Sequence, residues 1–153
     1  LARPGGVDGM AGGQALDLGS EGSASRDADI ARMQAMKTGA LFGFACEAGA
    51  VLGGADQMSR EALLAFASAF GQAFQLADDL TDAEGDVATA GKAVAKDADR
   101  GKATLVALLG IEESRDRLRA LTENAIPALA PFGTRAATLT DAARYVASRG
   151  NAA

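Results

Sequence analysis

The chain has 153 residues, with 15 Lys+Arg against 20 Asp+Glu and a formal net charge of −5. This length suits one domain, and the acidic balance argues against a nucleic-acid binder and against electrostatic attachment to a membrane, because both need a basic face. The sequence contains no histidine and one cysteine, Cys46, so histidine triads, histidine metal sites, intramolecular disulfides and multi-cysteine zinc sites are excluded. A single thiol is typical of a reducing compartment, and we expect a cytoplasmic protein.

The composition predicts an all-α fold. Hydrophobic residues make up 48% of the chain, and 37 Ala and 16 Leu stand against nine Val and Ile. Ala and Leu favour helices, whereas β-branched residues favour strands. The most apolar stretch, residues 38–55, is interrupted by Glu47, and no run of about twenty apolar residues occurs, so we expect no membrane span. In chain order, helices are expected over residues 10–18, 28–52, 60–84, 102–109, 114–121 and 134–148.

Glycines mark several of the expected boundaries and contacts. Gly53 and Gly54 should end the second helix, Gly85 is expected to cap the third, and residues 87–101 are predicted to form a long loop. Within the second helix, three glycines should allow a neighbouring helix to approach closely. They are Gly39, Gly43 and Gly49.

Three aspartates in the segment 74–86, FQLADDLTDAEGD, are the strongest chemical signal. Asp78 and Asp82 are four residues apart and share one helix face, while Asp79 lies about 100° round the helix. A solvated acidic face is the simplest interpretation of such a pattern. However, the C-terminal half of a helix disfavours negative charge, and the aspartates directly follow the apolar residues 70–77. Because Mg²⁺ prefers oxygen ligands and shares its coordination with substrate phosphates, we interpret Asp78, Asp79 and Asp82 as Mg²⁺ ligands.

Lysines are scarce and unevenly placed, since the chain has four of them against eleven arginines. Lys37 precedes Thr38 and Gly39 in the second expected helix, and the remaining three lysines follow the aspartates. Compact ammonium groups beside glycines suit the oxygens of a diphosphate. A solvated loop of chance composition is the alternative for the later three, and no Gly-x-x-x-x-Gly-Lys-Ser/Thr phosphate-binding loop occurs. These three are Lys92, Lys96 and Lys102.

Five sequence blocks occur in order along the chain. They are Gly12-Gly13-Gln14-Ala15-Leu16-Asp17, Lys37-Thr38-Gly39, Phe74-Gln75-x-x-Asp78-Asp79-x-x-Asp82-x-x-Gly85-Asp86, Gly91-Lys92 and Gly101-Lys102-Ala103-Thr104. In this order and spacing, the chain resembles the trans-isoprenyl diphosphate synthases, the polyprenyl synthetase family that includes farnesyl and geranylgeranyl diphosphate synthases. The resemblance covers about residues 9–110 and is greatest to the bacterial short-chain farnesyl type.

The resemblance implies an isoprenoid synthase fold, a helical bundle around a deep central cavity, usually in a homodimer. It also implies a prenyltransferase of isoprenoid biosynthesis. In that reaction an allylic diphosphate ionises with the help of Mg²⁺, and the double bond of isopentenyl diphosphate attacks it to elongate the chain. Preorganised cations stabilise the departing diphosphate, so the chemistry requires no protein nucleophile.

The resemblance also assigns roles to individual residues. Asp78, Asp79 and Asp82 match the second of the family's two aspartate-rich motifs, which hold Mg²⁺ on the allylic diphosphate. Three of the matching positions would carry catalysis: Lys37 and Lys102 by stabilising the leaving diphosphate, and Asp78 through the Mg²⁺ that it binds. The positions that match contacts to the allylic diphosphate or its metal ions are Lys37, Thr38, Gln75, Lys92 and Lys102.

The family's first aspartate-rich motif, with its paired arginines, and its isopentenyl diphosphate site are absent from these 153 residues. We therefore expect residues 1–153 to be the C-terminal part of a single polyprenyl synthase domain, inactive alone and ordered only against an N-terminal half or a second copy. The alternative is a non-catalytic helical subunit of a heteromeric prenyl synthase, which binds a partner chain. The apolar walls that a half-domain would expose include Phe42, Phe44, Phe70 and Phe74.

Overall fold

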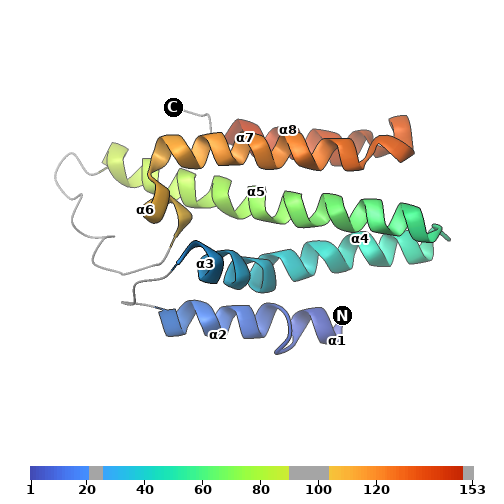
Figure 1. Cartoon of the computed structure of the whole chain (residues 1–153), viewed down its shortest axis with the longest axis horizontal. Helices are drawn as coiled ribbons and strands as arrows, with labels where there is room; N and C mark the ends of the chain where they lie inside the picture. Colours follow the sequence, from blue (N-terminus) through green and yellow to red (C-terminus); the bar gives the residue numbers. More distant parts are fainter. Residues whose placement is uncertain (21–25, 90–103, 150–153) are drawn as a thin grey trace.

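The computed structural model describes residues 1–20, 26–89 and 104–149. Regular structure in these ranges is entirely helical, which confirms the all-α expectation. Figure 1 shows the helices lying side by side in an elongated bundle, with the longest of them in the middle. The elements are α1 (Ala2–Gly5), α2 (Met10–Ser20), α3 (Asp27–Gln34), η1 (Ala35–Gly39), α4 (Ala40–Leu52), α5 (Gln57–Thr89), α6 (Leu105–Leu109), α7 (Ile111–Ala128), η3 (Ala130–Ala136) and α8 (Ala137–Arg149).

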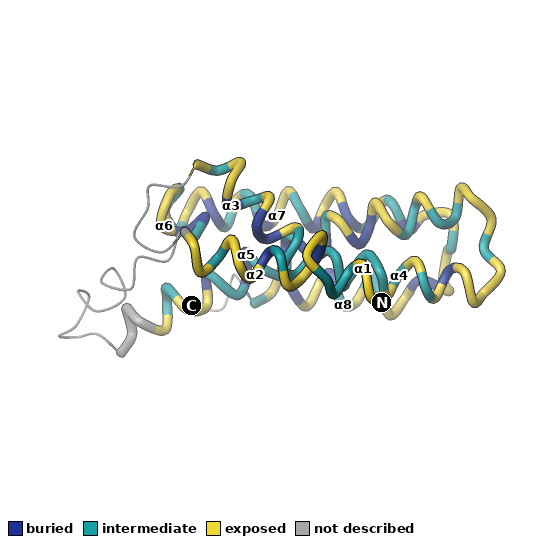
Figure 2. The backbone as a smooth tube through the Cα atoms, turned by 90° about the horizontal axis from the view of Figure 1, so that it is seen from below, coloured by how far each residue is buried: buried dark blue, intermediate teal, exposed yellow. Residues whose placement is uncertain are grey.

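The long helix α5 organises the bundle. It packs against α7 and α8 on one side and against α4 on the other, while α2 lies along η1, a turn of π-helix (Figure 1). Its buried positions recur every three or four residues, among them Phe66, Phe70 and Ala73, as an amphipathic helix requires. Figure 2 shows the buried positions on the inside of the bundle and the exposed ones outside. In this described part of the chain, no helix has both the length and the apolar character needed to cross a membrane.

The expected helices are present with shifted ends. The helix expected over residues 28–52 appears as α3, η1 and α4 in succession and ends at Gly53 and Gly54, as predicted. Gly54 has a φ of 67°, a left-handed conformation that favours glycine. The helix expected over residues 114–121 is part of the longer α7, which starts directly after Gly110. Gly110 has a φ of 85°, and this turn of the backbone separates α7 from α6.

The helix cap predicted at Gly85 is wrong. Helix α5 runs through Gly85 to Thr89, and the φ of Gly85 is not positive. A glycine inside a helix costs only about 1 kcal/mol relative to alanine. The preceding turn is tied to α7 by an ion pair between Glu84 Oε1 and Arg115 Nη2 at 2.5 Å, which favours continuation of the helix past the glycine.

The phenylalanines expected to form an exposed wall largely cover one another. Phe70 is buried, whereas Phe42, Phe44 and Phe74 are half-buried. Phe42 meets Phe70 edge-on, with ring centroids 5.0 Å apart and planes at 88°. The ring centroids of Phe42 and Phe74 are 5.4 Å apart. Edge-on aromatic pairs contribute about 0.5–1.5 kcal/mol beyond the area that they bury. Within this chain, these rings therefore close the contact between α4 and α5.

Close approach of helices occurs at one of the three glycines predicted for it. A Cβ added to Gly71 of α5 would lie 3.2 Å from the Gly39 Cα, so α5 and η1 touch through their backbones at this point. Nothing among the described residues lies within 4 Å of a Cβ added at Gly43 or Gly49. The prediction is therefore confirmed for Gly39 and wrong, within this part of the chain, for the other two.

Candidate functional site

A pocket opens where α2, α3, η1 and α5 meet the residue that precedes α6. Three of the residues predicted to bind substrate or metal line it, namely Lys37, Gln75 and Asp79. The lining also contains residues to which the motif analysis gave no role. These are Asp17, Met33, Gln34 and Thr104.

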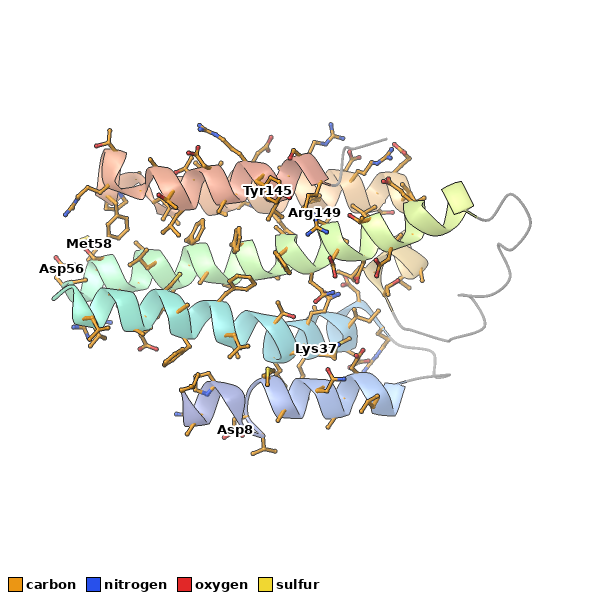
Figure 3. The ribbon with its side chains drawn as sticks, turned by 180° about the vertical axis from the view of Figure 1, so that it is seen from behind. Asp8, Lys37, Asp56, Met58, Tyr145 and Arg149 are labelled. Atoms are coloured by element: carbon orange, nitrogen blue, oxygen red, sulfur yellow. The ribbon has the colours of Figure 1, made fainter. Side chains whose placement is uncertain are left out.

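The three aspartates of α5 lie in three different environments. Asp79 lines the pocket and accepts hydrogen bonds from two amides. Asp78 accepts one from Arg149 Nη2 at the end of α8, at 3.2 Å, and Figure 3 shows Arg149 reaching from α8 toward α5. Asp82 is exposed. The turn of about 100° between successive residues separates Asp78 from Asp79, as the sequence predicted, so that Asp79 alone of the three lines this pocket.

Burial raises the pKa of Asp79 to about 6. The hydrogen bond from Gln75 opposes this rise, and the charges of Asp78 and Asp82 add to it. The hydrogen bond from Gln34 is a further opposing effect. Near neutral pH the carboxylate is therefore mostly ionised in a place where its charge is poorly solvated. A cation bound beside Asp79 would relieve both the burial cost and the repulsion from its neighbours.

A chain of hydrogen bonds links three of the predicted site residues. Thr38 Oγ1 donates to Gln75 Oε1 at 3.0 Å, and Gln75 Nε2 donates to Asp79 Oδ1 at 3.1 Å. From the other side, Gln34 Nε2 donates to Asp79 Oδ2 at 3.0 Å. Sequence reasoning missed Gln34. The signal that could have found it is its spacing of three residues from Lys37, which places both on one side of the helix.

Lys37 is carried by η1 and held by α2. Its Nζ donates a hydrogen bond to Asp17 Oδ2 at 2.6 Å, and the two form an ion pair. Figure 3 shows Lys37 between its own helix and α2. Asp17 ends the first of the five sequence blocks, so the structure connects that block to the second one, which contains Lys37. The pairing holds the ammonium group at the pocket.

The contact between α2 and η1 depends on Gly13. A Cβ added to this buried glycine would lie 2.6 Å from the Lys37 Cα and closer still to the Lys37 amide nitrogen. Any side chain at this position would push the two backbones apart. The glycine therefore allows α2 to lie close enough for Asp17 to reach Lys37.

Lys92 and Lys102, with the unmatched Lys96, lie outside the described residues. Thr104, two residues after Lys102, lines the pocket and accepts a hydrogen bond at Oγ1 from the Ala107 amide at 3.1 Å, which caps α6. Contacts of Lys92 and Lys102 with a diphosphate stay predictions.

The donor set suits Mg²⁺ shared with another ligand. Among the residues that the structure describes, no three Asp, Glu or Cys side chains are grouped closely enough to hold a metal ion by themselves. Mg²⁺ is usually bound by one or two carboxylates together with waters and substrate phosphates, and an all-protein cage is uncommon. Asp79 fits this kind of site because it offers hard oxygen atoms and a poorly solvated charge at a pocket that also contains an ammonium group.

Residues 6–129 match the sequence profile described as polyprenyl synthetase. The chain belongs to the polyprenyl synthetase family. Farnesyl diphosphate synthase of Escherichia coli is 41% identical over 126 residues, which are 82% of this chain and 42% of that protein. Geranylgeranyl pyrophosphate synthase 11 of Arabidopsis thaliana is 35% identical over 155 residues, 99% of this chain and 43% of that protein.

A solved structure agrees with this assignment. The crystal structure of an FPP/GFPP synthase from Zymomonas mobilis superimposes with a TM-score of 0.81 at 45% identity, over 94% of this chain and 47% of that one. The resemblance predicted from five sequence blocks is thereby confirmed, as is the fold class. This polyprenyl synthetase chain spans less than half the length of these relatives.

Proposed function

We propose that the chain supplies the Mg²⁺–diphosphate site of a trans-prenyltransferase, which condenses an allylic diphosphate with isopentenyl diphosphate in isoprenoid biosynthesis. The observation that carries the proposal is the meeting of Lys37, Gln75 and Asp79 at one pocket. A diphosphate needs cationic and neutral donors, and the Mg²⁺ that accompanies it needs a carboxylate. The relatives named as farnesyl and geranylgeranyl diphosphate synthases support this substrate class.

The proposed reaction breaks the allylic C–O bond, and the bonding electrons leave with the diphosphate. The double bond of isopentenyl diphosphate forms a new C–C bond to the allylic carbon, and a proton is then lost. Bound Mg²⁺ would neutralise charge on the departing diphosphate. In this chain, the ammonium group of Lys37 would stabilise the same leaving diphosphate, and Asp79 would bind the Mg²⁺. Asp78 and Asp82 are the further ligands that the resemblance assigns.

Binding of a diphosphate with Mg²⁺ would replace two ion pairs that the structure contains. Lys37 is paired with Asp17, and Asp78 is paired with Arg149. All four side chains are partly exposed, so water screens both ion pairs. A diphosphate carries several negative charges, so it can replace Asp17 at the ammonium group at little cost. The resting pair therefore keeps Lys37 in place without blocking the site.

The proposal extends to the assembly. We propose that turnover requires this chain to pack against sequence that carries the family's first aspartate-rich motif, in a cytoplasmic homodimer, and that residues 1–153 alone are inactive. The lengths of the relatives, of which this chain spans less than half, support this view. No feature of the described residues favours the alternative of a non-catalytic subunit, since the pocket retains its acid, amides and ammonium group.

The test measures binding and turnover separately in the complete enzyme, meaning this chain with the sequence that naturally accompanies it. Asp79→Ala and Lys37→Ala should each lower prenyl product formation by orders of magnitude while helical circular dichroism is retained. In isothermal titration calorimetry, inorganic pyrophosphate and Mg²⁺ should bind together, and each alone only weakly, because Mg²⁺ dehydrates reluctantly.

The matched control for these variants is Asp141→Ala. Asp141 is exposed on α8 and pairs with Arg144 three residues further along the same helix, at 3.4 Å. This variant should bind and turn over like the unmodified enzyme. Full activity in Asp79→Ala, or an equal loss in Asp141→Ala, would contradict the assignment of the site.

A further inference from the structure

A buried amide that no sequence motif assigns lies against the carboxylate of Asp79. Gln34, the last residue of α3, is 6% exposed, and its Nε2 donates a hydrogen bond to Asp79 Oδ2 at 3.0 Å. Of the buried polar side chains in the described ranges, Gln34 is the one that lines the pocket. We propose that Gln34 is a positioning residue, which fixes the Asp79 carboxylate in the orientation that binds Mg²⁺ with diphosphate. This inference rests on the proposed function.

The carboxylate of Asp79 is held at both of its oxygens. Gln34 reaches Oδ2 from α3, and Gln75 reaches Oδ1 from the preceding turn of α5 at 3.1 Å. The Gln75 amide is itself oriented, because its Oε1 accepts a hydrogen bond from the Thr38 hydroxyl at 3.0 Å. One donor would allow the carboxylate to turn about its Cβ–Cγ bond. Two donors from different elements prevent that rotation.

This arrangement leaves Asp79 able to bind a cation. A carboxylate offers about four lone-pair directions, and the two amides use two of them. Neutral amides do not repel Mg²⁺, whereas the guanidinium of Arg149 on Asp78 does. Asp82 is exposed, so Asp79 is the aspartate of the three whose direction is set by neutral amide donors before a ligand binds. Hydrogen-bond partners of metal ligands typically contribute about 10–100-fold to metal affinity or activity.

The test replaces Gln34 in the complete enzyme and measures the dependence on Mg²⁺. Gln34→Met keeps the length of the side chain but removes its donor, and Gln34→Asn keeps the amide but withdraws it by one methylene. Gln72→Met on α5 is the matched control, because the Gln72 amide donates to the Ser68 carbonyl one turn earlier, at 3.3 Å, and does not line the pocket. Calorimetric titration with inorganic pyrophosphate at increasing Mg²⁺ gives the Mg²⁺ concentration for half-maximal binding. Thermal melting followed by circular dichroism reports stability.

Either Gln34 variant should stay folded and raise the half-saturating Mg²⁺ concentration about tenfold or more, and Gln72→Met should leave that concentration unchanged. A folded Gln34 variant whose half-saturation stays within about twofold of the unmodified enzyme overturns the positioning role. Loss of folding in both Gln34 variants overturns it too, since that assigns the residue to stability alone. If the unmodified enzyme binds no pyrophosphate in the presence of Mg²⁺, the proposed function fails and this inference fails with it. The unmodified enzyme therefore distinguishes the two failures.

Discussion

Replacing Gly13 with alanine tests whether the close contact between α2 and η1 at this glycine keeps Asp17 near enough to Lys37 to form their ion pair. The added Cβ would lie 2.6 Å from the Lys37 Cα, and ordinary van der Waals contact begins at 3.4 Å. The backbones of α2 and η1 must therefore separate by about 0.8 Å or more, the difference between these distances. Because Asp17 is on α2 and Lys37 is on η1, the same movement lengthens their ion pair, now 2.6 Å.

The magnitude follows from the kind of atoms that collide. Inserting a methyl group into a packed interior typically costs about 1–3 kcal/mol. We expect the upper end for Gly13→Ala, because the colliding atoms are backbone and no side-chain rotation can relieve them. In a protein of 150–250 residues, about 3 kcal/mol corresponds to a melting temperature that is lower by about 6–12 °C, and in the longer complete enzyme the decrease is smaller. Calorimetry with pyrophosphate and Mg²⁺ should show weaker binding at the same time, because Lys37 is displaced from the pocket.

The control lies in the same helix. Gly19 of α2 is exposed, and none of the residues that the structure describes lies within 4 Å of a Cβ added there. Gly19→Ala should leave binding unchanged and should stabilise the helix by up to about 1 kcal/mol, since alanine favours helix over glycine. If Gly13→Ala melts like the unmodified protein and binds pyrophosphate equally well, the argument that this glycine places Lys37 is refuted.

Four further outcomes are expected. Lys102→Ala should lower turnover about 10²–10³-fold, the usual effect of losing one donor to a developing oxyanion, whereas Lys96→Ala should be nearly silent; equal losses would contradict the residue assignment. Leu118→Ala should lower the free energy of unfolding in urea by about 2–5 kcal/mol, because Leu118 is 1% exposed in the core, and an unchanged midpoint would contradict that packing. Burial raises the pKa of the Cys46 thiol, so it should react with a maleimide at pH 7 more slowly than free cysteine does; equal rates would count against this burial. The chain Leu1–Ala153 alone should yield no prenyl product and should self-associate in size-exclusion chromatography, and a monomer that makes product would overturn the half-domain proposal.

Features that depend on local periodicity could be predicted from the sequence. The helical spacing that separates Asp78 from Asp79 is a property of any α-helix, and the structure shows the two side chains in different environments. The paired glycines at positions 53 and 54 end a helix for equally local reasons, since Gly54 adopts a left-handed φ of 67°. The cap predicted at Gly85 fails because the local preference there is small, about 1 kcal/mol, and α7 holds the preceding turn through Arg115.

The partners of the site residues could not be predicted in this way, because they come from distant segments of the chain. Gln34 and Asp79 are 45 residues apart, and Arg149 and Asp78 are 71 residues apart. Helical periodicity states which way a side chain points but not what faces it, and neither partner belongs to one of the five sequence blocks. The blocks treat the three aspartates as one set of equivalent ligands. Packing makes them unequal, because it places a buried neutral amide at one aspartate, a guanidinium at another and solvent at the third.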